Sequence, residues 1–160
     1  MRPIRNISHP KKVKISNRAR ISILNLQNRI PVDQASIKRV IQKVLSTEAP
    51  KDSGLVNITI VNDRVIKKIN KLYLNHNFAT DVLAFDLSDS KRRLFCPDIV
   101  VSADTAYKNS KVFHTSPTYE LFLYIIHGIL HILGYDDKTK KARESMNGRA
   151  QMFLDLLHIK

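Results

Sequence analysis

The chain has 160 residues, enough for a single domain with one hydrophobic core and too few for two. Lys and Arg number 27 against 14 Asp and Glu, a formal net charge of +13, which indicates a polyanionic partner, nucleic acid before an anionic membrane surface. No segment approaches the roughly 20 consecutive apolar residues that span a bilayer, which argues against a membrane protein. The single cysteine, Cys96, cannot form an internal disulfide, as suits a cytoplasmic protein.

Residues 1–19 are expected to form a basic N-terminal arm. They contain several Lys and Arg, and the first acidic residue of the chain is Asp33. No apolar stretch marks a secretory signal. An organellar transit peptide is the disfavoured alternative, because Pro3 and Pro10 would interrupt its amphipathic helix. We therefore expect a solvated arm that contacts RNA, followed by one domain over residues 20–160.

Alternating apolar residues predict strands at residues 20–25 and 55–61, and each is followed by a helical pattern. Residues 31–45 form an amphipathic helix in this interpretation, with Asp33 as its N-cap. Residues 62–74 return to helical spacing. The positions predicted to face inward on this second helix are apolar: Val65, Ile66, Ile69 and Leu72.

Residues 80–87 and 98–106 are two more apolar runs of strand length, separated by a charged loop. The last part of the chain is helical in this interpretation, over residues 116–133 and, after a break at Gly134, over residues 138–157. Strands and helices alternate early, and helices dominate late. This order predicts an α+β fold, a single domain in which a mixed sheet of about four strands packs with helices.

The segment HGILHILGYDD, residues 127–137, places His127 and His131 four residues apart in an apolar helical pattern. Side chains at this spacing lie on one face of a helix with Cβ atoms about 5–6 Å apart, so the two imidazoles can converge on one metal ion. Apolar residues surround them on nearly every side, as in a buried central helix. Buried imidazoles need partners. The metal site is the preferred interpretation, and hydrogen bonds to backbone carbonyls in the core are the alternative.

Gly134 can adopt the left-handed conformation that ends a helix and turns the chain back toward the last turn. Asp137 can then supply a carboxylate as a third ligand. Two histidines and one carboxylate bind catalytic zinc with an open position for water, and the same set also binds iron(II). We expect one Zn2+ per chain, or another divalent metal, bound by His127, His131 and Asp137.

Gly128 helps to distinguish peptide hydrolysis from phosphodiester hydrolysis. A helix-borne zinc peptidase motif, His-Glu-x-x-His, carries its general base at this position, so a zinc peptidase is disfavoured. A metal-bound water that attacks a phosphodiester of RNA agrees with both the ligands and the charge. Asp81 and Asp98 stand at the starts of strand-like runs and could support this water as general bases. The alternative is that both carboxylates form turn-capping hydrogen bonds.

The residues around this motif resemble the YbeY family of bacterial endoribonucleases and rRNA maturation factors. Three separated blocks carry the resemblance. The family signature His-Gly-x-Leu-His-Leu-x-Gly-Tyr-Asp-His is matched at His127, Gly128, Leu130, His131, Gly134, Tyr135 and Asp136. The block INKLYLNHNFATDVLAF is matched at Asn70, Tyr73, Thr80, Asp81, Val82, Leu83 and Phe85. The block PDIVVS is matched at Asp98, Ile99, Val101 and Ser102.

The resemblance implies a zincin-like α+β fold whose central helix carries the HxxxH pair. It also implies a zinc-dependent endoribonuclease specific for single strands, acting in maturation of the 3′ end of small-subunit rRNA and in ribosome quality control. RNA and the small ribosomal subunit are then the partners, with no membrane and no nucleotide cofactor. Two departures concern the chemistry: Asp137 replaces the third zinc-binding histidine of the family, and Leu74 replaces an arginine.

Basic and aromatic side chains supply candidate RNA contacts. Lys71, Arg92 and Arg93 could bind phosphate in place of the missing arginine. Tyr73 could stack on a base, although aromatic residues in such patterns are more often core. A chain that lost cleavage with the arginine would be a noncatalytic ribosome- or RNA-binding factor with a structural metal. A chain without metal would be an RNA-binding domain with two core histidines.

Overall fold

The computed structural model describes residues 19–49, 54–89 and 94–159, and in them one four-stranded sheet packs with five helices. The elements are β1 (Arg20–Asn25), α1 (Gln34–Glu48), β2 (Leu55–Val61), α2 (Asp63–Leu74), β3 (Val82–Asp86), β4 (Pro97–Ser102), α3 (Ala103–Phe113), α4 (Pro117–Ile132) and α5 (Lys140–Leu156). The strand order is β1-β2-β4-β3, with β3 antiparallel to β4 and the other pairs parallel. This is the predicted single-domain α+β fold with a mixed sheet. Of the predicted basic arm, residues 1–18 lie outside the described residues.

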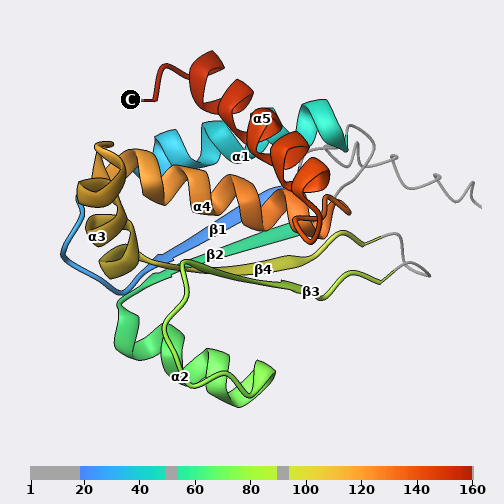
Figure 1. Ribbon diagram of the computed structural model, residues 1–160. Helices are drawn as coiled ribbons and strands as arrows, with labels where there is room; N and C mark the ends of the chain where they lie inside the picture. Colours follow the sequence, from blue (N-terminus) through green and yellow to red (C-terminus); the bar gives the residue numbers. More distant parts are fainter. Residues whose placement is uncertain (1–18, 50–53, 90–93, 160) are drawn as a thin grey trace, which may run out of the picture.

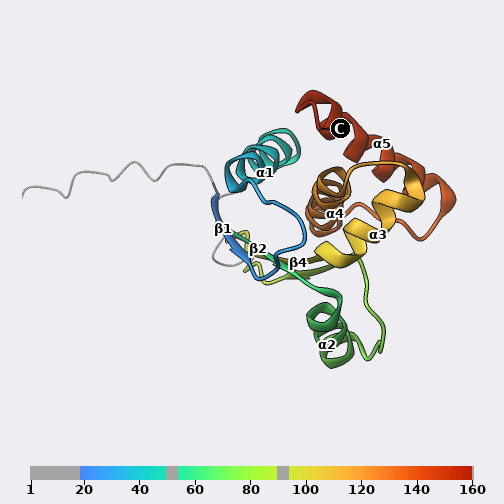
Figure 2. The ribbon, with the colours of Figure 1, turned by 90° about the vertical axis from the view of Figure 1, so that its left-hand side faces the viewer.

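Helix α4 is the central helix of the fold. Helices α1, α3, α4 and α5 lie on one side of the sheet, and α2 lies alone on the other (Figures 1 and 2). Helix α4 contacts β3 and β4 as well as all three helices on its own side, and most of its side chains are buried. In the residues described, no helix is long and apolar enough to cross a membrane. The apolar residues around the histidine pair pack against the sheet and the helices of this layer.

Side-chain caps set where the helices begin. The carboxylate of Asp33 accepts the N–H of Ala35 at the start of α1, as predicted. Ser116 caps α4 and is followed by Pro117 in the first turn, where proline loses no helical hydrogen bond. The caps of the other helices are also polar: Asn62, Ser102 and Thr139.

The region between the last strand and α4 differs from the prediction. The strand-like run over residues 98–106 is wrong beyond Ser102, where β4 ends and α3 begins. The Ser102 hydroxyl accepts the N–H of Thr105 and so starts a helix. Two alanines, which favour helix, then enter the core: Ala103 and Ala106. The sequence remains largely apolar from β4 into α3, so its pattern does not show where the strand ends and the helix begins.

Leu72 is the second correction, because its side chain is 76% exposed instead of facing inward. The buried direction of α2 is set by Ile66 and Asn70. At about 100° per residue, position 72 points well away from that direction. The apolar residue was therefore assigned to the wrong face.

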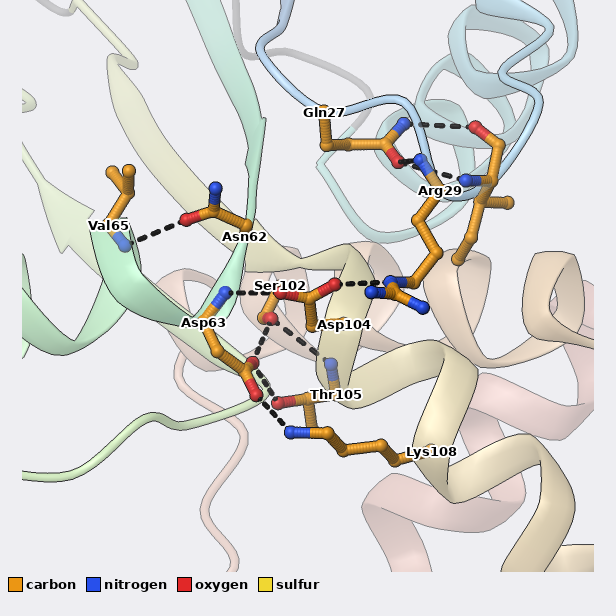
Figure 3. A network of polar contacts seen from close by, with 10 residues as sticks. Gln27, Arg29, Asn62, Asp63, Val65, Ser102, Asp104, Thr105 and Lys108 are labelled. Atoms are coloured by element: carbon orange, nitrogen blue, oxygen red, sulfur yellow. Dashed lines mark hydrogen bonds and ion pairs between the residues drawn. The ribbon is translucent and has the colours of Figure 1, made fainter.

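A polar network joins the N-terminal ends of α2 and α3 (Figure 3). The carboxylate of Asp63 accepts hydrogen bonds from Ser102 Oγ at 2.5 Å, Thr105 Oγ1 at 2.7 Å and Lys108 Nζ at 2.6 Å. The Asp104 carboxylate accepts the Asp63 N–H and pairs with Arg29. Burial raises the pKa of Asp63, but the hydrogen bonds from Lys108, Ser102 and Thr105 outweigh burial and hold that pKa below its ordinary value. The network therefore favours the ionised carboxylate.

We expect Asp63→Asn to lower the free energy of unfolding by about 1–3 kcal/mol at neutral pH, because a charged acceptor of three hydrogen bonds is lost. The folded pKa lies below the unfolded value of about 3.9, so this stabilisation is present above that value and is lost as the pH falls through the folded pKa. Urea unfolding at pH 7 and at acid pH should show the difference from wild type shrinking below about pH 4. Asp86→Asn, at an exposed strand end, is the control, and an equal effect there would contradict the prediction.

Candidate metal centre

His127 and His131 lie one turn apart on α4, and Gly128 between them shows how closely this helix approaches the sheet. A Cβ at residue 128 would lie 2.8 Å from Ile99 Cγ2 and 3.1 Å from Val82 Cγ2. Position 128 therefore faces β3 and β4, and no larger side chain fits there. The glutamate of a His-Glu-x-x-His peptidase would collide with the sheet at this position.

His127 is a buried imidazole with an unused ring nitrogen. Its Nε2 is inaccessible to solvent and has no hydrogen-bond partner in the described part of the chain. Burial lowers the pKa of His127, the charge of Asp81 opposes this effect, His131 adds to it and Asp137 opposes it. The ring is therefore neutral at physiological pH, as a metal ligand must be. A histidine held only by core hydrogen bonds would not leave this nitrogen unpaired.

The hydrogen bond of His131 indicates which of its ring nitrogens carries a proton. Its Nδ1 lies 3.2 Å from the carbonyl oxygen of Tyr135. A carbonyl only accepts, so Nδ1 carries a proton, and in the neutral form of the ring the free electron pair is then on Nε2. Metal-binding histidines commonly donate their second N–H to a carbonyl in this way. The predicted alternative, a backbone hydrogen bond, therefore holds for Nδ1 of His131, but it does not account for the buried Nε2 of His127.

Gly134 ends α4 as predicted, with φ of 94°. Its N–H donates to the carbonyl of His131, and the Tyr135 N–H donates to that of Leu130, both at 3.0 Å. This is the Schellman pattern, which turns a chain back over the last helical turn. The turn brings Asp137 Oδ2 to 3.8 Å from His131 Nε2. The sequence-based expectation that the turn returns Asp137 to the histidines is therefore met for His131.

The three predicted ligands are close together without forming a finished coordination set. Within residues 19–49, 54–89 and 94–159, no three His, Cys, Asp or Glu side chains are arranged to hold a metal ion. The feature that fits a metal ligand is the buried Nε2 of His127, which has no hydrogen-bond partner in the described residues. The half-exposed carboxylate of Asp137 lies on the loop beside one of them, so completing a three-ligand set requires its side chain to move.

The structure separates the two candidate general bases. Asp81 precedes β3, where its carboxylate accepts hydrogen bonds from Thr80 Oγ1 and the Val82 N–H, and its charge acts on His127. Asp98 lies on the other face of the sheet, because its neighbour Ile99 points at α4 and strand side chains alternate. Burial raises the pKa of Asp98. Of the two carboxylates, Asp81 is the one whose charge acts on His127, and its two local hydrogen bonds are those of the turn-capping alternative.

The predicted RNA contacts on α2 also lie across the sheet from the histidine pair (Figure 1). Tyr73 is 65% exposed, so the core interpretation of this residue is wrong, and its ring is tilted against that of Phe85 at 5.3 Å between centroids. Lys71 is exposed in the last turn of α2, and Leu74 is half-exposed. Arg92 and Arg93 lie outside the described residues.

Sequence analysis missed a cluster that surrounds Tyr135. The Tyr135 hydroxyl donates to Glu48 Oε2 at 2.9 Å, and Arg149 Nε pairs with Glu48 Oε1. Two signals were available, an aromatic residue within the signature and a glutamate at the unfavourable C-terminal end of a helix. Neither signal predicts that Glu48 contacts Tyr135 and Arg149 in the folded chain.

The family model and the similar proteins that carry a name point to one family. The sequence model of the family described as Endoribonuclease YbeY matches residues 22–158 of this chain. The Endoribonuclease YbeY of Syntrophus aciditrophicus is 34% identical over 86% of this chain and 89% of that protein, and that of Carboxydothermus hydrogenoformans is 30% identical over 84% and 95%. The solution structure of TM1509 from Thermotoga maritima superposes with a TM-score of 0.58 at 24% identity, covering 86% of this chain and 91% of that one. The last likeness supports the fold alone.

Proposed function

The chain belongs to the YbeY endoribonuclease family, and from this premise we propose that it cleaves single-stranded RNA by metal-dependent hydrolysis at the His127 and His131 site. The observation that carries the proposal is the buried Nε2 of His127, which has no hydrogen-bond partner among the residues that the structure describes. A polar atom in this state costs free energy in a folded protein. A metal ligand role accounts for that cost.

His127 and His131 would hold the ion through their Nε2 atoms, with Asp137 as the third ligand. We propose one zinc per chain, and the same donors also suit iron(II). When bound, such an ion activates water for attack on a phosphodiester. Burial favours the neutral form of His127, and the Tyr135 carbonyl orients His131. In this proposal Asp81, whose charge acts on His127, accepts a proton.

Exposed basic side chains beside the histidine pair provide cations for the RNA backbone. Lys138, Lys140 and Lys141 follow Asp137 directly and are exposed. Arg143 Nε donates to the Asp137 carbonyl, which holds a guanidinium at this loop. In this proposal these residues supply phosphate contacts at the site, in a chain that has Leu74 in place of the family arginine. Lys71, on α2, adds a cation on the other side of the sheet.

The family and the net charge of the chain support a more specific proposal for the substrate. A net charge of +13 suits a partner as anionic as the ribosome. We propose that the substrate is the 3′ end of small-subunit rRNA, processed in the cytoplasm on the small subunit during maturation and quality control. Leu74 favours a second candidate, a noncatalytic ribosome-binding factor that keeps the metal.

Metal and RNA assays on the purified protein test the proposal. We expect about one zinc per chain and cleavage of single-stranded RNA that stops with a chelator and returns with added metal. Duplex RNA of the same sequence is the control and should stay intact. RNA that is bound but never cut, with ribosomes still co-purifying, would select the noncatalytic factor. Purified protein that contains no metal and takes up none when zinc is added, yet still binds RNA, would contradict the metal site itself.

A further inference from the structure

Three elements of the fold meet at the carboxylate of Glu48. Glu48 is the last residue of α1, and its side chain is only 11% exposed. Its Oε2 accepts the hydroxyl of Tyr135, from the loop after α4, at 2.9 Å. Its Oε1 pairs with the Nε of Arg149, from α5. The carboxylate therefore joins α1, α5 and the loop of the metal site.

A glutamate that is nearly buried at the end of a helix carries a free-energy cost that its contacts must offset. The C-terminal end of a helix carries partial negative charge, which disfavours a carboxylate, and burial adds a desolvation cost. Arg149 offsets both, and its guanidinium is itself held over the Phe153 ring and against the Met152 sulfur. A carboxylate at residue 48 is therefore explained by its two partners, the Tyr135 hydroxyl and the Arg149 guanidinium, which come from different elements.

Tyr135 connects this cluster to the histidine pair. Its hydroxyl is held by Glu48, while its carbonyl accepts Nδ1–H of His131 at 3.2 Å and its N–H donates to Leu130. The two ends of one residue are therefore fixed to different parts of the fold. Movement of the phenol would displace the carbonyl that orients His131.

We propose that Glu48, Tyr135 and Arg149 form a positioning cluster for the metal centre. The cluster fixes the Tyr135 carbonyl, which holds the His131 ring in the Nδ1-protonated tautomer and leaves Nε2 available as a ligand. It also sets the start of the loop that carries Asp137. The part of this inference that concerns metal affinity depends on the proposed function; the part that concerns the tautomer does not.

Tyr135→Phe removes the hydroxyl alone and keeps the packed ring. We expect zinc affinity, measured by competition with a chelator well below the melting temperature, to fall about tenfold, as for other groups that orient ligands. Tyr119→Phe is a matched control, because Tyr119 also links α4 to α5 by donating its hydroxyl to Gln151 at 2.6 Å. Both variants should shift the denaturation midpoint by a similar small amount, and Tyr119→Phe should leave zinc affinity unchanged.

Nitrogen NMR of 15N-histidine in the metal-free protein provides a second measurement. Wild type and Tyr119→Phe should show His131 protonated at Nδ1, and Tyr135→Phe should show a mixture of tautomers. Zinc binding with equal affinity in both tyrosine variants, or an unchanged tautomer in Tyr135→Phe, would overturn the positioning role. A wild type that binds no zinc while Tyr135→Phe still alters the tautomer would sink the proposed function and support the cluster.

Discussion

Replacing His127 with leucine should reduce RNA cleavage by about a hundredfold or more, since losing a ligand should cost at least as much as losing a group that orients one. The folded protein should survive, because leucine fills a similar space on an apolar helix. The variant also removes the buried Nε2 that has no partner among the described residues. We therefore expect the metal-free variant to be as stable as wild type or about 1 kcal/mol more stable.

The pH dependence of stability tests the same residue without RNA. Burial holds the pKa of His127 below its ordinary value of 6.5, so between the two values the unfolded chain binds a proton that the folded chain does not. Stability should therefore be full above about pH 6.5 and fall as the pH drops toward the folded pKa.

Urea unfolding in the presence of a chelator should show this loss in wild type, and His127→Leu should lack its contribution. If the leucine variant cleaves RNA at the wild-type rate, His127 is a core residue and not a metal ligand. A large loss of stability in the variant would instead show that the imidazole has a structural partner.

The parts of the site predicted correctly from sequence depend on local physics. Helical spacing alone puts His127 and His131 on one face. Gly134 is the residue that accepts the left-handed conformation at a helix end, and the structure has it there with φ of 94°. Asp33 and Ser116 cap helices because their side chains reach backbone N–H groups within a few residues.

The parts that sequence could not predict depend on tertiary contacts. Alternation along β4 puts Asp98 and Ile99 on opposite faces, but only the packing of α4 shows which face holds the histidines. Glu48 meets Arg149 across 101 positions, and no local pattern encodes that pairing. The start of α3 was missed for a related reason, since Ala103 is apolar in either a strand or a buried helix.

Gly128→Ala should lower both stability and cleavage, because the added Cβ would lie 2.8 Å from Ile99 Cγ2. Alanine favours helix by about 1 kcal/mol, but overpacking a core typically costs about 1–3 kcal/mol, so we expect net destabilisation. The helix would also move away from the sheet and carry the histidines with it. A displacement of about 1 Å can reduce a rate about a hundredfold.

Gly148→Ala is the matched control, because Gly148 is exposed on α5 and a Cβ there would meet nothing within 4 Å. Helix propensity should then stabilise the protein by about 0.5–1 kcal/mol with cleavage unchanged. If contact with Ile99 is the cause, Ile99→Ala should cost less in the Gly128→Ala background than in wild type. Additive costs, or equal effects of the two glycine variants, would mean that close packing of α4 on β4 does not place the histidine pair.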